Sequence, residues 1–426
     1  MRVLFVSPLF PRDLSTSVHG VYQRMRMWLD AIQSLDADLD LLLFPPSEIP
    51  LGPETAAAVA RSLAESWGIR ADVMLCPREP EERPGGRLRE YLAAYVRPAL
   101  GLSWHPEFRP YLGRRQQEAF ALRLTRSPDI VFLDSLQAAG AARSGSLGGA
   151  RVLLDLDDVE HRRFAREVAQ PPSWRLKPLL YMQVPALWWG ERAAITRSTQ
   201  VFVCSDLDRR YLWRSMGVRN LQVIPNAVTR KDHRPLTSEP NVLFIGAYNY
   251  PPNVVAAEYL IREVWPRLVS MCPRARLLIA GAHQEAIRSR GEAPSGVEFL
   301  GFVSDLDALY GRTRVLCCPV QSGGGTRIKI LEAASYGVPV VSTPLGAEGI
   351  DLAADKEIVL RSSTQGLAEA CAGLLEDDVR ARDIGASARD RTRDLYSRDA
   401  VVRRMRAILS ADSGVERWHE SSLIAR

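Results

Sequence analysis

The sequence predicts an α/β protein that contains two doubly wound parallel sheets. Short, nearly continuous apolar runs alternate with amphipathic stretches, and the alternation starts again after a polar stretch in the middle of the chain. Such apolar runs are typical of parallel strands that helices cover on both faces, and strand–helix repeats predict parallel sheets. The chain has 426 residues, which is enough for two or three domains.

A first series of strands fills the N-terminal half. Tyr22–Leu35 and Asp206–Met216 have the periodicity of helices that pack on a sheet. Stretches rich in arginine and aromatic residues interrupt the series at 83–126 and 162–192. Either ordinary helix packing or a patch for a membrane surface or lipid acceptor would explain these stretches. The expected strands are Val3–Ser7, Leu39–Phe44, Ile130–Leu133, Val152–Asp155, Val201–Cys204 and Leu221–Ile224.

A second series follows the stretch Asn226–Asn241, whose charged residues and prolines are typical of a linker. We therefore expect one domain at residues 1–230, a second at 231–395 and a C-terminal segment at 396–426. Ligands of such sheets bind beyond the carboxyl ends of the strands, so the cleft between the domains is the expected site. The expected strands are Val242–Ile245, Leu277–Ala280, Val297–Leu300, Val315–Cys318, Val338–Val341 and Ile358–Leu360.

The composition limits which classes of molecule the protein is expected to bind. A net charge of +5 suits an anionic small molecule or an acidic membrane surface and is too weak to indicate nucleic acid. The six cysteines form no C-x-x-C pair, so we expect free thiols in a reducing compartment. The first residues read as a buried strand rather than a signal peptide, and no apolar run reaches the roughly 20 residues that span a bilayer. We expect a cytoplasmic protein and leave open a peripheral contact at the inner membrane face.

The most informative segment is Pro319–Thr343, in which three glycines, Gly323–Gly325, lie between a predicted strand and a predicted helix. Glycines allow close approach to the backbone and leave N–H groups free, and the start of a helix adds partial positive charge. Arg327 and Lys329 lie in the first turn, where the helix dipole disfavours cations. Two cations beside a glycine loop predict a diphosphate site.

Glu332 follows Lys329 by three residues, so the two side chains share one face of the helix. Lys329 would then contact phosphate, while Glu332 would accept hydrogen bonds from a pair of sugar hydroxyls. The alternative is a surface salt bridge between the two residues, next to a flexible loop.

This segment resembles the donor-binding signature of the retaining family-four glycosyltransferases, in the subgroup that reads G-G-G-x-R-x-K-x-L-E-A. The resemblance implies the GT-B fold, in which two Rossmann-like domains face a central cleft. Glu332 matches the second glutamate of the family's E-x7-E pair, which binds the donor ribose. Gly324 stands where the family has the first glutamate, which contacts the donor sugar. We therefore expect the N–H groups of Gly324 and Gly325 to replace this contact to the donor sugar.

Weaker matches occur in the family's order along the chain. His19-Gly20 resembles the first-strand loop that approaches the donor phosphates, and Ile224–Val228 resembles the linker motif I-P-N-G-V. Phe244–Asn253 lacks the family's arginine and lysine, so Arg327 and Lys329 would bind the pyrophosphate as catalytic residues. The implied donor-binding residues are Gly20, Gly246, Val303, Gly323, Gly324, Gly325, Thr326 and Glu332.

The segment Asp155–His161 ends a predicted strand and contains four acids. The resemblance places it on the acceptor side of the cleft, where Asp157, Glu160 or His161 would orient the acceptor hydroxyl, His161 as a catalytic group. Acids that stabilise the start of the next helix are an alternative. A metal site at these acids is another alternative, but the doubly wound architecture argues against it.

The implied reaction is transfer of a sugar from an NDP-sugar to a hydroxyl of a polysaccharide, lipid-linked or small-molecule acceptor. Retention, no metal and no cofactor are expected. The resemblance also implies that a last helix, about Asp399–Leu409, crosses back toward the first domain. Pro8–Gly20 lacks the G-x-G-x-x-G of a nicotinamide dehydrogenase. A nucleotide-sugar epimerase and a non-catalytic sugar-nucleotide-binding protein of the same fold remain open.

Overall fold

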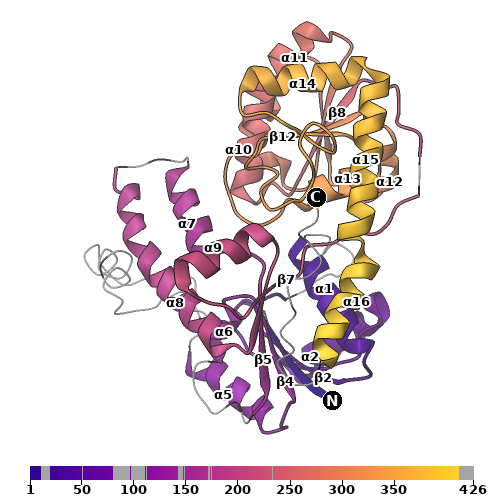
Figure 1. The fold of residues 1–426 in the computed structure, drawn as a ribbon. Coiled ribbons are helices and arrows are strands. Elements are labelled where there is room, and N and C mark those ends of the chain that lie inside the picture. Colours follow the sequence, from indigo (N-terminus) through magenta and orange to yellow (C-terminus); the bar gives the residue numbers. More distant parts are fainter. Residues whose placement is uncertain are drawn as a thin grey trace.

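Two parallel sheets form the framework of the protein in a computed structural model (Figure 1). The structure describes residues 1–10, 20–49, 51–79, 113–142, 149–170, 175–232 and 234–411, and the single residues 96, 111, 147 and 173. The first sheet has seven strands in the order β3-β2-β1-β4-β5-β6-β7, and the second has six in the order β10-β9-β8-β11-β12-β13. The predicted α/β class with two doubly wound parallel sheets is confirmed.

The first sheet winds outward from its central strand β1, in which Val3 pairs with Leu39 on one side and with Ile130 on the other. All six strands that the sequence predicts here are present, with ends shifted by one or two residues. The short edge strand β3 was not predicted, because its apolar run, Val73–Leu75, is only three residues long. The strands are β1 (Arg2–Ser7), β2 (Asp38–Leu43), β3 (Asp72–Leu75), β4 (Ile130–Asp134), β5 (Arg151–Leu156), β6 (Gln200–Val203) and β7 (Leu221–Val223).

The second sheet repeats this plan around β8. Its central strands are fully buried, as a sheet covered on both faces requires. The six predicted strands are again present within one or two residues. They are β8 (Asn241–Ile245), β9 (Arg276–Ala280), β10 (Val297–Gly301), β11 (Val315–Cys318), β12 (Val340–Ser342) and β13 (Val359–Leu360).

Helices cover both sheets (Figure 1). None of the helices in the described parts of the chain has both the length and the apolar character needed to cross a membrane. Those of the first half are α1 (Gly20–Gln33), α2 (Pro53–Trp67), α5 (Arg114–Leu124), α6 (Ala138–Ala141), α7 (Glu160–Ala169), α8 (Val184–Arg197) and α9 (Asp206–Met216). Those of the second half are α10 (Pro251–Tyr259), α11 (Trp265–Met271), α12 (Leu306–Gly311), α13 (Ile328–Ser335), α14 (Thr364–Glu376), α15 (Asp378–Tyr396) and α16 (Arg398–Ser410).

The last two helices join the two halves. In Figure 1, α15 lies along the second sheet and α16 continues down to α1 of the first. Val401, Met405 and Leu409 of α16 are buried in the core of the first half. Arg398 forms an ion pair with Asp30 of α1 at the start of this contact. The α16 helix is therefore part of the first core, although it follows the second in sequence.

Candidate functional site

The glycine loop, Gly323–Gly325, lies between β11 and α13, at the carboxyl edge of the second sheet. Gly323 and Gly325 have φ angles of 93° and 65°, a left-handed conformation that other residues rarely adopt. Arg327 is buried, and its guanidinium donates to the carbonyls of Ser322 at 3.2 Å and of Gly324 and Gly325. The sequence suggested that Arg327 faces a diphosphate. In the structure the guanidinium of Arg327 instead stabilises the loop by donating hydrogen bonds to the carbonyl groups of the loop.

The side chain of Lys329 is directed into the second domain and does not lie on its surface. Its ammonium donates to Asn253 Oδ1 at 2.9 Å and lies 4.3 Å from the ring centre of Phe244. A Cβ on Gly246 would be only 2.9 Å from Lys329 Nζ, so this glycine makes room for the ammonium. Burial lowers the pKa of Lys329 from 10.5 to about 8. No ion pair among the described residues joins Lys329 to Glu332, so the alternative of a surface salt bridge is wrong.

Glu332 is largely buried on α13, at the contact with the first domain. Burial raises the pKa of its carboxyl group, and a hydrogen bond with Gln23 of α1 is the strongest opposing effect. Glu332, which the sequence predicts to bind the donor ribose, is thus covered by α1, the first helix of the other half. Gly20, which begins α1, is one turn from Gln23, whereas His19 lies outside the described residues.

Asn226 ties the linker to both halves. Its Nδ2 donates to Thr326 Oγ1 at 2.7 Å, and its Oδ1 accepts from Arg24 at 3.2 Å. Arg24 forms a buried ion pair of 2.6 Å with Asp155, which also accepts from Trp28 at 2.9 Å. Asp155 is therefore a packing residue of the first core. A continuous polar chain runs from it to the helix that follows the glycine loop.

Asp158, which follows β5 by two residues, lies directly against the glycine loop. Its Oδ1 accepts a hydrogen bond from the N–H of Gly325 at 3.1 Å. A Cβ on Gly324 would come within 2.1–2.2 Å of the two carboxylate oxygens, so a larger residue could not occupy position 324 in this arrangement. Burial, followed by the charge of Asp157, raises the pKa of Asp158 from 3.8 to about 7, although Arg163 and Arg327 oppose the shift.

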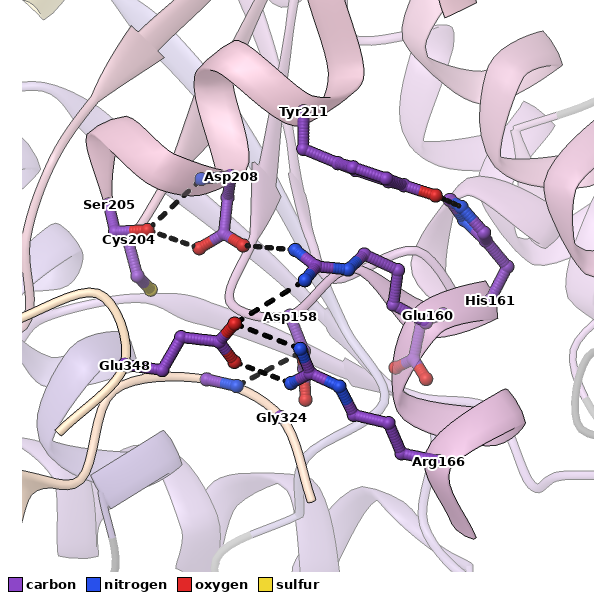
Figure 2. A network of polar contacts seen from close by, with 12 residues as sticks. Asp158, Glu160, His161, Arg166, Cys204, Ser205, Asp208, Tyr211, Gly324 and Glu348 are labelled. Carbon is purple, nitrogen blue, oxygen red and sulfur yellow. Dashed lines mark hydrogen bonds and ion pairs between the residues drawn. The ribbon is translucent and has the colours of Figure 1, made fainter. Parts of the chain in front are cut away.

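Arg162, Arg166 and Glu348 form a cluster that we call the α7–Glu348 clasp. It closes the cleft beside Asp158 (Figure 2). Arg166 donates to Glu348 Oε1 at 2.9 Å and to the carbonyl of Gly323 at 3.3 Å, and Arg162 lies 3.3 Å from Glu348. Burial alone would raise the pKa of Glu348, but the hydrogen bonds and charges of the two arginines outweigh it and lower the pKa. The cavity enclosed between clasp and loop measures about 10 Å³, room for about one water molecule.

His161 and Glu160 do not face the glycine loop. Figure 2 shows the ring of His161 directed at Tyr211, whose hydroxyl is 2.7 Å from Nε2, and its Nδ1 bonds Glu191. His161 is only 4% exposed, so the structure does not support the expected catalytic and acceptor-orienting role. Glu160 is buried as well and bonds Arg163 at 2.7 Å. Gln137 donates to Glu160 Oε1 at 3.4 Å, so both residues hold α7 to neighbouring segments.

The remaining predicted residues lie near the loop or on the same edge of the sheet. The backbone carbonyl of Asp157 would lie 3.5 Å from a Cβ on Gly325, and burial raises the pKa of the Asp157 carboxyl. Gly246 follows β8, and Val303 follows β10 and packs on the second core. Among the described residues, no group of three or more His, Cys, Asp or Glu side chains is arranged to hold a metal ion.

Several residues of the site were missed at the sequence level. Asp158 was visible only as one of the four acids between Asp155 and Glu160, and Asn253 has no local signal beyond its place near a helix start. Glu348 is 186 positions from Arg162 and 182 from Arg166 along the chain, so only folding brings it to these arginines.

Two family models match successive parts of this chain. The model described as Glycosyltransferase Family 4 matches residues 54–231, and the model described as Glycosyl transferases group 1 matches residues 239–377. The second match contains the glycine loop and α13, and the first contains Asp158 and α7. The glycine loop, Asp158 and the arginines of α7 therefore lie within the matched regions, whereas Gly20 and Gln23 of α1 precede them.

Three similar proteins are a mannosyltransferase, a synthase and a protein solved with UDP and glucose. Phosphatidyl-myo-inositol mannosyltransferase of Mycobacterium leprae is 31% identical over 202 residues, which are 43% of this chain and 52% of that protein. The chain thus matches about half the length of this curated relative. Sucrose-phosphate synthase of Thermosynechococcus elongatus superposes with a TM-score of 0.65 at 16% identity, over 96% of this chain and 98% of that one. HepE of Anabaena, solved with UDP and glucose, has a TM-score of 0.61 at 14% identity over 96% and 99%. At this identity the structures show the shared fold.

Proposed function

We propose that this chain, a glycosyltransferase of the GT-B fold, transfers a sugar from an NDP-sugar to a hydroxyl acceptor. The observation that carries the proposal is the convergence of three groups on one short helix start. The glycine loop supplies N–H groups, Lys329 supplies a buried cation, and Glu332 supplies a carboxylate beside the other domain. This set fits the phosphates and the sugar hydroxyls of one donor molecule.

Each group has a distinct part in the proposed reaction. Negative charge builds on the diphosphate as the bond to the sugar breaks, and Lys329 and the loop N–H groups stabilise that charge. Arg327 is a positioning residue, because it holds the loop carbonyls so that the N–H groups stay available. Glu332 accepts hydrogen bonds from ribose hydroxyls. The domains hold donor and acceptor together between them, which lowers the entropic part of the barrier.

We also propose that the sugar is transferred with retention, by attack from the face that the diphosphate leaves. The acceptor proton then passes to the leaving phosphate oxygen, so no separate protein base is required. This fits the position of His161, whose two ring nitrogens are engaged by Glu191 and Tyr211. The anomeric configuration of the product, read by NMR coupling constants, tests this step; inverted product would contradict it.

The protein groups that face the diphosphate lead us to propose turnover without a divalent metal. Unchanged turnover in excess chelator is the expected result. If chelator abolished turnover and manganese restored it, a metal would have to stabilise the leaving group. Asp157 and Asp158 would then be the first residues to test.

A ligand panel tests the function itself. We expect one family of UDP-, GDP-, ADP- or dTDP-sugars to raise the melting temperature, because a ligand that binds only the folded state stabilises it. The corresponding nucleosides serve as controls and should have little effect. The best donor is then incubated with and without a mixture of sugar acceptors. Sugar transfer supports the proposal, conversion of the donor without acceptor indicates an epimerase, and binding without any turnover indicates a sugar-nucleotide-binding protein.

A further inference from the structure

The glycine loop has a different charge on each of its two sides. On the side of the second domain lies the ammonium of Lys329, held by Asn253 and Phe244. On the side of the first domain lies the carboxylate of Asp158, bonded to the N–H of Gly325. An NDP-sugar has the same polarity, because its charged diphosphate is joined directly to a neutral sugar that is rich in hydroxyl donors.

A carboxylate in this position does not suit a phosphate ligand. Two negative groups a few ångströms apart in a partly buried site repel each other by several kcal/mol. A carboxylate does suit sugar hydroxyls, since it accepts their hydrogen bonds in charge-assisted contacts. The diphosphate therefore belongs on the Lys329 side, and the sugar belongs on the Asp158 side.

Gly324 makes the approach of Asp158 possible. The two carboxylate oxygens lie where a Cβ would be, at 2.1 and 2.2 Å from the ideal position. Gly324 has no left-handed φ angle, so its backbone would accept alanine, and the absence of a side chain serves the contact with Asp158. Asp158 forms no ion pair within the described parts of the chain, so a ligand does not have to compete with a salt bridge for its oxygens.

We propose that Asp158 is a specificity-determining contact to the transferred sugar, which the first domain supplies across the cleft through the space that Gly324 leaves open. This inference rests on the proposed function. In the structure the carboxylate accepts a hydrogen bond from the N–H of Gly325. The neighbouring cavity of about 10 Å³ is far too small for a hexose. The sugar must therefore replace the contact between Asp158 and Gly325, and the cleft widens to admit it.

The test compares an NDP with the NDP-sugar of the same base, using the pair that stabilises the unsubstituted protein most in the panel. Asp158→Ala should weaken NDP-sugar binding by about 10–100-fold, the equivalent of one charge-assisted hydrogen bond. NDP binding should change by less than about threefold or become tighter, because the repelling charge is gone. Asp158→Asn keeps one acceptor oxygen, so its affinity for the NDP-sugar should lie between those of the unsubstituted protein and of Asp158→Ala. Asp206→Ala, which removes an exposed aspartate from the neighbouring α9, is the matched control and should change neither affinity.

Gly324→Ala provides a second and independent readout. Its methyl group would displace the Asp158 carboxylate, so this variant should weaken NDP-sugar binding as Asp158→Ala does. In the Asp158→Ala background the same methyl group has no carboxylate to displace, and Gly324→Ala should have little further effect. Such non-additivity is the signature of two residues that act through one contact.

The outcomes separate this inference from the function on which it rests. If no NDP or NDP-sugar stabilises the unsubstituted protein, the proposed function fails, and the inference fails with it. If NDP-sugars bind and Asp158→Ala tightens NDP and NDP-sugar alike, Asp158 only blocks the loop and the inference is overturned. Equal affinities in all variants would also overturn it, while the proposed function would stand.

Discussion

Two cations of one motif have different roles in this protein. Arg327 and Lys329 are two positions apart and read alike in the sequence, yet the structure directs them to opposite tasks. Arg327 donates to loop carbonyls, while Lys329 is an ammonium whose pKa burial lowers to about 8. A buried cation without an anionic partner destabilises the folded state. Lys329 is therefore a candidate for a residue kept for ligand binding rather than for stability.

Lys329→Met tests this assignment at the residue scale. Without donor, the free energy of unfolding at about pH 7 should rise by about 1–3 kcal/mol, because the cost of burying an ammonium is removed. The folded-state pKa lies below the unfolded value, so this cost is complete below about pH 8 and disappears as the pH rises toward the unfolded pKa of 10.5. The advantage of the variant should shrink across that window. Urea unfolding at a series of pH values measures it.

The same variant should lower kcat by about 10²–10³, the effect of removing one preorganised electrostatic contact. Arg327→Ala is the control, since it should lower the free energy of unfolding instead, by about 1–3 kcal/mol, as buried carbonyls lose their donor. A Lys329→Met enzyme with normal turnover and a normal NDP-induced shift in melting temperature would remove Lys329 from the site.

Glu332→Gln should weaken donor binding more than it slows the bound complex. A carboxylate that accepts ribose hydroxyls contributes equally to the ground state and the transition state. The expected kinetic result is a raised KM for the donor at nearly constant kcat. Gln23→Ala, which removes the partner of Glu332 in the first domain, should leave the KM unchanged or lower it. A large loss of kcat at constant KM would instead assign Glu332 to the chemical step.

At the scale of elements, the packing of α7 controls the approach to the glycine loop. The helix presents Arg162 and Arg166 to Glu348 while its other face is held by His161, which bonds Glu191 and Tyr211. Because the arginines bond a loop of the second domain, the position of α7 depends on how far the cleft is closed. Opening the cleft for a donor must break these contacts.

A double-mutant cycle of Arg166→Ala and Glu348→Ala measures the strength of the α7–Glu348 clasp. The side chains are 25% and 23% exposed, so we expect a coupling energy of about 0.5–2 kcal/mol, between that of a surface pair and a buried pair. Raised salt should weaken the coupling. The cycle in the presence of saturating NDP-sugar should give a smaller value, since the donor opens the cleft. A coupling that stays the same with donor would show that the clasp does not take part in opening.

At the scale of the whole molecule, α16 makes the first domain depend on the end of the chain. Val401, Met405 and Leu409 are at most 3% exposed in the first core. Each buried side chain of this type contributes about 1.5–3 kcal/mol. Their sum is comparable to the whole stability of a typical domain, about 5–15 kcal/mol.

A chain that ends at Tyr396 should therefore fail to form a stable first domain. We expect an early unfolding transition, separate from that of the second domain, in calorimetry. A chain that ends at Ala411 keeps the contacts of α16 with the described residues and is the control. If the chain ending at Tyr396 still melted in one transition at the temperature of the control, the contact of α16 would not stabilise the first core.

Apolar periodicity by itself determined the fold class and twelve of the thirteen strands, because a strand buried on both faces must be apolar throughout. The residue types also predicted an anion site at Gly323–Gly325, since a glycine loop before a helix start is a local feature. The directions of Lys329 and His161 were decided only by the tertiary structure. A side chain turns to the partner that folding brings near, and the partners Asn253 and Glu191 are 76 and 30 positions away. The contact of Asp158 with Gly325 spans 167 positions and two domains. No local pattern encodes such a contact, because it exists only when the carboxyl ends of the two sheets face each other.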